Sequence, residues 1–343
     1  KTCWKTIKPC GGGIASSVQK WFDFNLKPAV EQVIKCVEFS WNLEDLVFAN
    51  IEDSSPFWIV KRENLDELII NEAIKLGAEL IKPFSVNKIE KHKQIWQVYS
   101  EKGEKMESSS IIIADGSNSP WPKQLGLGPK SNHYAMTTSI RLKGNGTLPK
   151  DRSRFEFGLV KNGFAWAFPL KSEVNMGVGT FIGKNNSNNE SLLKKLMFDL
   201  GFEANNQQTK KSLLRVWNGH QQIHGDGVVV IGDAASLCDP FLAEGLRPAI
   251  MSGYEASHSI NEWLEGNNSS LQSYSTSMRK NWGESMAWGR RIAQVFYRFP
   301  NVGYQIGIKR PTAPRRIAQI LSGEFGYEDI AKRVIKRLLF QKS

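Results

Sequence analysis

Cysteine and histidine are scarce in this sequence, with four and five copies among 343 residues. Four cysteines in a chain of this length do not indicate a disulfide scaffold, so we expect a reducing compartment such as the cytosol. The histidines show no spacing with cysteine or acid that would indicate a metal site. No run of eighteen apolar residues is present, and the first twenty residues lack an apolar core, so neither a transmembrane helix nor a signal peptide is predicted.

Acidic residues are outnumbered: 45 Lys and Arg stand against 34 Asp and Glu, a formal net charge of +11. Residues 309–343 alone hold nine basic and three acidic side chains, a net charge of +6. Basic charge can indicate nucleic-acid binding, but no helix-turn-helix, zinc-finger or RNA-recognition pattern accompanies it. We therefore expect no nucleic-acid partner, and an anionic membrane surface is the better candidate.

The C-terminal stretch 327–340 repeats apolar residues at helical spacing, with Lys332, Arg333, Lys336 and Arg337 opposite them. Such a helix either packs on its own domain with its basic face in water, or lies on a membrane surface. Both possibilities remain open. We expect a cytoplasmic protein with a candidate peripheral contact to anionic membranes through 327–340.

The most informative segment spans residues 228–249. Four β-branched residues open it, as is typical of a buried parallel strand, and Gly232-Asp233 ends that strand. A loop containing Pro240 and Gly245 then leads into an apolar helix. A strand end of this kind can offer a carboxylate to a ribose, and the helix N-terminus can face an electron-rich group.

The rest of the chain alternates strand and helix patterns. We predict a helix over 64–77 with Gly77 as its C-terminal cap, a β-hairpin over 86–106, and a buried strand at 111–113 that ends in Asp115-Gly116. The remaining predictions are a mainly antiparallel sheet over 133–216, interrupted by a helix through residues 192–197, and helices from about residue 253 onward.

Several short motifs follow one another in a characteristic order: Lys-Pro-Cys-Gly-Gly-Gly at 8–13, Val-x-Arg with Leu-Asp and Leu at 60–68, Ala-Asp-Gly at 114–116, and Gly-Asp at 232–233. This order resembles the geranylgeranyl reductase family, within the para-hydroxybenzoate-hydroxylase-like flavoproteins. Gly-Phe-Ala-Trp-Ala-Phe-Pro at 163–169 is similar to that family's Tyr-x-Trp-x-Phe-Pro substrate-cavity motif, with Phe164 in place of the tyrosine. The ending at 320–327 is also similar.

The resemblance implies an α/β fold in which an FAD-binding Rossmann-like domain is interleaved with an antiparallel-sheet substrate domain and followed by a helical C-terminal region. The predicted boundaries are 1–30, 60–130 and 215–265 for the FAD-binding domain, 31–59 and 131–214 for the substrate domain, and 266–343 for the helical region. A flavoprotein of this type should open with a strand, Gly-x-Gly-x-x-Gly and a helix, which are absent here. We therefore expect that a first βαβ unit of about 30 residues or more is missing.

The resemblance also implies cofactor contacts, which we expect from Gly11, Gly12, Arg62, Asp115, Gly116, Gly232, Asp233, Pro240, Gly245 and Leu246. Asp233 would hold the ribitol or ribose hydroxyls, and Asp115 would support it. Residues 240–246 would direct backbone N–H groups to the flavin pyrimidine edge. Arg62 is either near the cofactor or an ordinary surface arginine. Cys10 is the candidate catalytic thiol, although a buried thiol acting as a small hydrophobic group is the commoner case.

Trp166 and Phe168 alternate along one predicted strand, so both side chains can point into the same cavity. Two aromatic residues in an ordinary sheet core would give the same pattern. With the family resemblance, we favour an isoprenoid pocket that also includes Phe164 and Pro169. The missing tyrosine hydroxyl at position 164 makes this pocket more apolar.

By resemblance, we expect an FAD-dependent oxidoreductase that reduces carbon–carbon double bonds of a geranylgeranyl or polyprenyl chain, on a chlorophyll or isoprenoid-lipid type of substrate. The electron donor is either NADPH or ferredoxin. The alternatives are an FAD-dependent monooxygenase on the same fold and an inactive flavin-binding remnant. The sequence identifies no proton donor.

Overall fold

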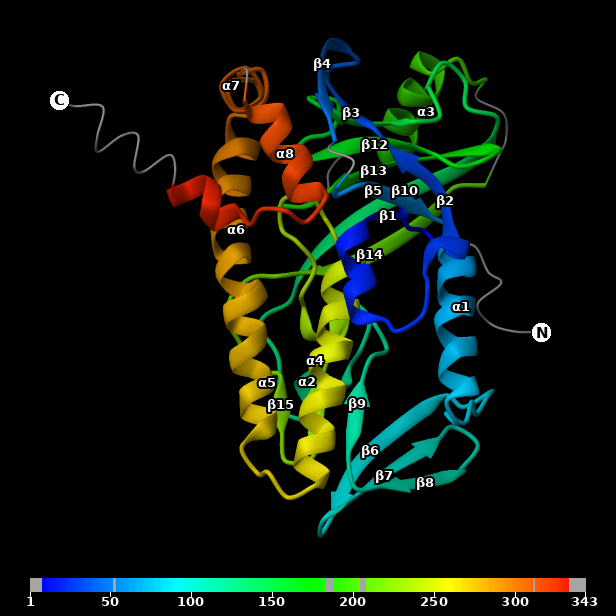
Figure 1. Cartoon of the computed structure of the whole chain (residues 1–343), viewed down its shortest axis with the longest axis vertical. Helices are drawn as coiled ribbons and strands as arrows, with labels where there is room; N and C mark the ends of the chain where they lie inside the picture. The colour runs from blue at the N-terminus through cyan, green and yellow to red at the C-terminus, as the bar shows by residue number, and fades with distance from the viewer. Residues whose placement is uncertain (1–7, 52–53, 183–187, 204–207, 311, 333–343) are drawn as a thin grey trace, which may run out of the picture.

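The structure is a computed structural model that describes residues 8–51, 54–182, 188–203, 208–310 and 312–332. Within these ranges, the strands form one large and three small sheets; the helices from residue 246 onward lie along one side of the molecule, and the helix over 62–75 lies on the other (Figure 1). This mixed α/β arrangement agrees with the predicted fold class. The predicted domain boundaries and the absent first unit stay predictions.

The large sheet has seven strands. In spatial order they are β14 (Lys210–Val216), β10 (His133–Lys143), β13 (Glu173–Thr180), β12 (Gly163–Pro169), β11 (Arg152–Phe157), β3 (Cys36–Trp41) and β4 (Glu44–Asn50). Neighbouring strands are antiparallel except β11 and β3, which pair in parallel. The predicted antiparallel region 133–216 is thereby confirmed, as is its helix, α3 (Asn189–Asp199).

The two faces of the large sheet differ because side chains alternate along each strand. On β11 and β12, Phe155, Phe164 and Trp166 point to one face and join the main hydrophobic core. Ala165 and Ala167 point to the other face and belong to the cluster that includes the apolar side chains of α3. Aromatic side chains of β11 and β12 therefore gather on the face that is not covered by α3.

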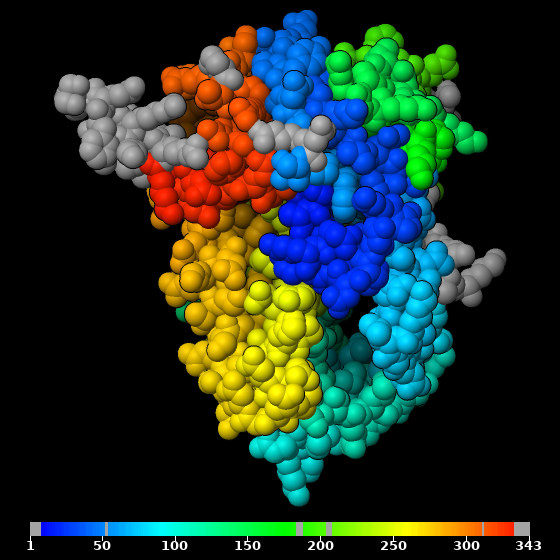
Figure 2. Space-filling model, viewed as in Figure 1, coloured from blue at the N-terminus to red at the C-terminus, as the bar shows by residue number. Residues whose placement is uncertain are grey.

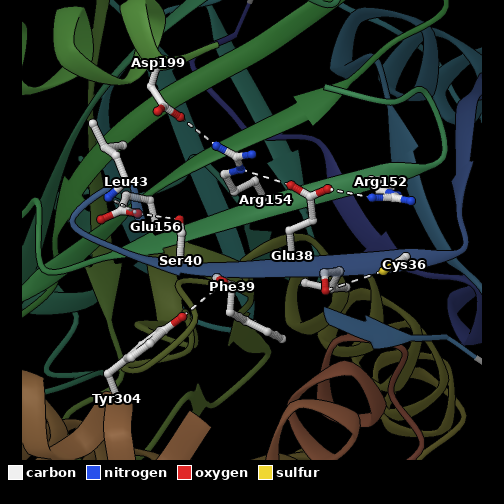
Figure 3. Close-up of polar contacts among 11 residues, drawn as sticks. Cys36, Glu38, Phe39, Ser40, Leu43, Arg152, Arg154, Glu156, Asp199 and Tyr304 are labelled. Carbon is white, nitrogen blue, oxygen red and sulfur yellow. Dashed lines mark hydrogen bonds and ion pairs between the residues drawn. The ribbon is translucent and has the colours of Figure 1, made fainter. Parts of the chain in front are cut away.

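Charged side chains on the α3 face pair with one another around the buried Glu38 (Figure 3). Glu38 of β3 accepts hydrogen bonds from Arg152, at 3.3 Å, and from Arg154, at 3.1 Å. Arg154 also donates to Asp199 at the end of α3, at 2.7 Å. Buried charges are tolerated when they are paired in this way, and the cluster links β3, β11 and α3.

Glu156 of β11 is fully buried on the same face. One carboxylate oxygen accepts hydrogen bonds from the Ser40 hydroxyl and the Leu43 amide, and the other has no partner (Figure 3). Burial raises the pKa of Glu156 to about 7, against the opposing effect of the hydrogen bonds from Ser40 and the backbone.

The small sheets have three strands each, in the orders β1 (Gly13–Ala15), β5 (Phe57–Val60), β2 (Val30–Ile34); β15 (His224–Gly225), β16 (Val228–Val230), β9 (Ile111–Ile113); and β6 (Val86–His92), β7 (Ile95–Ser100), β8 (Lys105–Ser108). The parallel pairing of β9 and β16 confirms both predicted strands, and β16 is buried as expected. The predicted burial of 111–113 is wrong, because β9 is an edge strand whose Ile112 is 43% exposed. The predicted hairpin over 86–106 is instead a three-stranded meander. An additional turn occurs at Lys93, whose φ of 54° places it in the left-handed region.

The helices of the described residues are α1 (Arg62–Lys75), α2 (Trp121–Gln124), α4 (Leu246–Leu264), α5 (Ser270–Met278), α6 (Glu284–Arg298), α7 (Pro300–Val302) and α8 (Ala313–Leu321). The predicted cap of α1 is confirmed, because Gly77 has a φ of +97° and donates to the Ile74 carbonyl. Among the described residues, no helix combines the length and apolar character needed to cross a membrane.

The basic amphipathic stretch lies mostly outside the described residues, which end at 332. Its first turn is described and packs on the protein. Tyr327 and Ala331 are buried, and the Tyr327 hydroxyl donates to Asp239 at 2.6 Å. Membrane contact through residues 333–340 therefore stays a prediction.

Residues 11–13 approach two strands closely. Gly12 has a φ of +81°, and a Cβ added to it would lie 2.2 Å from the Val60 carbonyl oxygen of β5. A Cβ on Gly11 would lie 2.9 Å from the Phe168 ring, and one on Gly13 would lie 2.5 Å from the Phe57 ring. Gly11 and Gly12 were expected to contact the cofactor, but the protein's own backbone and aromatic rings already require glycine at these positions.

Replacing Gly12 with alanine should therefore destabilise the fold by clearly more than the conformational cost alone. Gly103, in the turn between β7 and β8, is a matched control because its φ is +82° and a Cβ there meets nothing within 4 Å. The control should lose about 1–2 kcal/mol in the free energy of unfolding, the cost of a left-handed L-residue. Denaturant unfolding of both variants measures the difference, and equal losses would contradict a steric role for Gly12.

The Glu156→Gln variant should gain stability at alkaline pH. Because the folded-state pKa is about 7 and the ordinary value is 4.5, the folded protein binds this proton more tightly than the unfolded chain does. The associated stability is present below about pH 4.5 and is lost as the pH rises through about 7. The difference in the free energy of unfolding between the variant and the wild type should therefore favour the variant more at pH 8 than at pH 4.5, by up to about 3 kcal/mol. Urea unfolding of both proteins at pH 4.5 and pH 8 measures this difference. The same difference at both pH values would contradict the prediction.

Candidate functional site

A cavity of about 490 Å³ lies where the aromatic face of the large sheet meets the ends of β9 and β16 and the start of α4. On the face shown in Figure 2, the surface is hollowed between α1 and α4. The predicted site residues that line this cavity are Cys10, Gly11, Gly12, Arg62, Gly116, Phe164, Trp166, Phe168, Gly232, Asp233, Gly245 and Leu246. Segments far apart in the sequence are thus brought together as the motifs suggested.

Three predicted site residues do not line the cavity. Asp115 is exposed at the end of β9, beside Gly116, which does line it. Pro169 is buried at the end of β12. Pro240 lines a second, smaller cavity, which shares Phe181 with the first. These three residues have no direct access to the main cavity, and their expected roles stay predictions.

The apolar wall of the cavity is an aromatic cluster. Phe164 packs on Phe181 with ring centroids 4.7 Å apart, and Phe155 meets Phe168 edge-on at 5.3 Å. Trp166 lies between them in the strand and is only 6% exposed, yet its indole N–H has no hydrogen-bond partner. Because a buried donor without a partner is costly, a ligand with an acceptor atom would stabilise this wall.

The Trp166 ring packs directly against a glycine of the neighbouring strand. Gly177 is its cross-strand partner on β13, and a Cβ there would lie 2.1 Å from the indole ring. The aromatic wall thus depends on a missing side chain opposite the tryptophan, a requirement that the motif 163–169 alone does not reveal.

The strand β16 delivers Asp233 to the cavity. Gly232 turns the chain with a φ of +56°, and a short 3-10 turn, η4 (Gly232–Ala235), follows. Burial raises the pKa of Asp233 to about 6, while the positive charges of Arg62 and Arg215 oppose that rise. A carboxyl group with two nearby cations can accept hydrogen bonds from the hydroxyls of a ligand.

The N-terminus of α4 faces the same cavity. Its N-cap is Gly245, and no side chain caps the free backbone N–H groups. A Cβ on Gly245 would be 3.4 Å from an Asp233 carboxylate oxygen, so the strand end and the helix start are adjacent. An uncapped N-terminus of a 19-residue helix favours an electron-rich group.

Arg62 is not an ordinary surface arginine. It begins α1, lines the cavity, and forms an ion pair with Asp66 at 3.0 Å. Burial alone would lower the pKa of its guanidinium, but the neighbouring Cys10 and Asp66 raise it. Cys10 is a free cysteine beside this cation, and its backbone carbonyl accepts a hydrogen bond from Asn175 at 2.6 Å.

Two further charged residues at or near the cavity were not among the predicted site residues. Arg215 of β14 is 2% exposed and donates to the carbonyls of Ala234, at 3.0 Å, and Ser119, at 2.8 Å. It therefore fixes the turn after β16 against the large sheet. Glu244 lines the cavity directly before Gly245. No cluster of three potential metal ligands occurs among the described residues.

Comparison with known proteins relates this chain to reductases. No family model matches the sequence. The digeranylgeranylglycerophospholipid reductase of Methanocaldococcus jannaschii is 25% identical over 271 residues, covering 73% of this chain and 69% of that protein.

Solved structures share the fold. A geranylgeranyl bacteriochlorophyll reductase-like protein from Thermoplasma acidophilum superposes with a TM-score of 0.74 at 18% identity, over 91% of this chain and 81% of that one. A triple mutant of a flavin-dependent brominase gives 0.68 at 18% identity, over 91% and 84%. The fold is thus common to flavoproteins of several activities, whereas the sequence relationship is to the reductases. The chain is thus similar in sequence to digeranylgeranylglycerophospholipid reductases and shares its fold with a geranylgeranyl bacteriochlorophyll reductase-like protein.

Proposed function

We propose that this protein is an FAD-dependent reductase of carbon–carbon double bonds in a geranylgeranyl or polyprenyl chain. One observation carries the proposal: a single cavity joins an aromatic wall to a buried carboxyl group and an uncapped helix N-terminus. The aromatic side can hold an apolar chain, and the polar side can hold a flavin. The reductases among the relatives support the same substrate class.

The residues on the polar side fit FAD. The α4 amides can hold the electron-rich edge of the flavin, and Asp233 can accept hydrogen bonds from the cofactor's hydroxyls. Gly11, Gly12 and Arg62 complete this side. When bound, FAD supplies the hydride, with either NADPH or ferredoxin as the proposed source of electrons.

The aromatic side supports the chemistry of an isolated double bond. Reduction needs a proton at one carbon and a hydride at the other, and positive charge develops on the way. Phe155, Phe164, Trp166 and Phe168 line this part of the cavity without ionisable groups, so they exclude the water that would trap the charge. Cys10, beside Arg62, is the proposed catalytic thiol of this site.

The proposed partner is a lipid or other small molecule with a prenyl chain. A lipid substrate gives a reason for contact with an anionic membrane, which we propose for 327–340 in addition to the packing of its first turn.

The function is tested with the FAD-loaded protein, reduced chemically and incubated without oxygen with geranylgeranyl phospholipid, geranylgeranyl diphosphate and a prenylquinone. We expect at least one product that is heavier by two hydrogens per double bond, measured by mass spectrometry. Substrate-stimulated oxygen consumption in air with a hydroxylated product would instead identify a monooxygenase and overturn the proposal.

The Asp233→Ala variant should bind FAD more weakly. It removes a charge-assisted hydrogen bond worth roughly 1.5–3 kcal/mol, so the dissociation constant should rise by about 10- to 150-fold. Flavin content after extensive dialysis and titration calorimetry measure the change. Asp226→Ala is the control, because Asp226 is 68% exposed and does not line the cavity. Unchanged FAD affinity in the Asp233 variant would contradict the assignment.

The Trp166→Ala variant should lose turnover of a C20 prenyl substrate while its flavin is still reduced by the electron donor at the wild-type rate. The reason is that Trp166 is proposed to hold the alkene, which the donor step does not involve. A buried aromatic truncation costs about 3–5 kcal/mol, so Trp96→Ala is the matched control. Trp96 is 5% exposed and lies on β7, away from the cavity. If a folded Trp166 variant kept its prenyl turnover, the aromatic wall would be ordinary core.

A further inference from the structure

Glu244 lines the cavity and has one carboxylate oxygen without a hydrogen-bond partner. Its side chain is 11% exposed, and one oxygen lies 2.7 Å from the Arg247 guanidinium. The other oxygen, Oε1, is buried and has no hydrogen-bond partner among the described residues. Leaving an ionised oxygen buried and unpartnered is costly, so this atom favours either a proton or a bound ligand.

The loop before α4 holds Glu244 in place. Its backbone carbonyl accepts a hydrogen bond from the Asp239 amide at 2.9 Å, and Ala243 before it has a left-handed φ of 57°. Arg247, one turn into α4, lies over the Trp282 ring at 5.1 Å from its centroid. The cation and the loop together fix one carboxylate oxygen and leave Oε1 without a partner.

The charges around Glu244 keep its proton available near neutral pH. Burial raises the pKa of Glu244 to about 7, Arg247 opposes that rise, and the charge of Asp239 adds to it. Asp239 itself is buried and accepts hydrogen bonds from the Tyr327 hydroxyl and two backbone amides. An acid whose pKa is close to the working pH is well suited to donate and recover a proton in each turnover.

Other acids near the cavity are less suited to this task. Asp233 adjoins Gly245 and is proposed to hold the cofactor. Cys238 is fully buried and does not line the cavity, and burial together with the charges of Asp233, Asp239 and Glu244 raises the pKa of its thiol. Glu244 lines the cavity and has an unpartnered carboxylate oxygen, and the residues of the aromatic wall line the same cavity.

We propose that Glu244 is the catalytic acid that protonates the substrate alkene, an inference that rests on the proposed reductase function. The Oε1–H bond breaks and a C–H bond forms at one alkene carbon. The second carbon takes a hydride from the reduced flavin, which leaves the cofactor oxidised and converts C=C into CH–CH. Glu244 remains as a carboxylate paired with Arg247 and recovers its proton from water.

The test compares Glu244→Gln with the wild type in the full FAD-loaded chain under single-turnover conditions. Glutamine keeps the shape of the side chain but cannot donate a proton. We expect double-bond reduction, measured by mass, to slow by about 100-fold or more. FAD content and the rate of flavin reduction by the donor should be unchanged.

Glu156→Gln is the matched control, because Glu156 is also buried with a pKa of about 7 and an unpartnered oxygen, but lies on the opposite face of the large sheet. It should leave turnover unchanged. If the wild type reduces double bonds and the Glu244→Gln variant does so at a rate within about threefold of it, the catalytic assignment is overturned and the proposed function is not. A wild type that reduces no prenyl substrate would overturn the proposed function, and the assignment with it.

Infrared titration of the protein gives a readout that needs no turnover. A protonated-carboxyl band that titrates near pH 7, is absent from Glu244→Gln and persists in Glu156→Gln would identify the Glu244 proton. We expect this band to shift when geranylgeranyl substrate is added. If no such band depends on Glu244, or if substrate leaves it unmoved, the assignment is wrong even where the substituted protein folds poorly.

Discussion

The cavity exists because residues 11–13 pass between two sheets at distances that only glycine permits. Gly12 touches the backbone of β5 at Val60, while Gly11 lies against Phe168 of β12. These contacts bring the small sheet of β1, β5 and β2 against the aromatic face of the large sheet. They also place Cys10 and Arg62 at the rim of the same space that Trp166 and Asp233 line. A side chain at position 12 would collide with the Val60 carbonyl and push this segment away from β5.

The sequence was sufficient wherever a local pattern has one structural outcome. Four β-branched residues before Gly232-Asp233 can hardly form anything but a buried strand, and the parallel pairing of β16 with β9 follows from two such runs. The alternation of Trp166 with Phe168 likewise determines a shared face, and both side chains line the cavity. The hairpin over 86–106 was wrong because a left-handed Lys93 makes a turn without the glycine or proline that usually marks one.

Other features depend on distant partners and could not be predicted. Arg215 sits in an unremarkable strand sequence, and only the fold places its guanidinium on the carbonyls of Ala234 and Ser119. Glu156 and Glu244 are ordinary glutamates in the sequence. Burial raises both pKa values to about 7, but Glu156 is hydrogen-bonded to Ser40 and Leu43 on the α3 face, whereas Glu244 lines the cavity. The same chemical group is structural in one place and available for chemistry in the other, and only the packing distinguishes them.

The absent side chain at Gly177 has a consequence for substrate size. Because the indole of Trp166 rests directly on this position, any larger residue there would push the ring away from the sheet and into the cavity. A larger residue at position 177 would thus reduce the space beside the apolar wall without changing the identity of any residue that lines the cavity. For the proposed prenyl substrate, the accepted chain length would therefore depend on a residue that does not line the cavity.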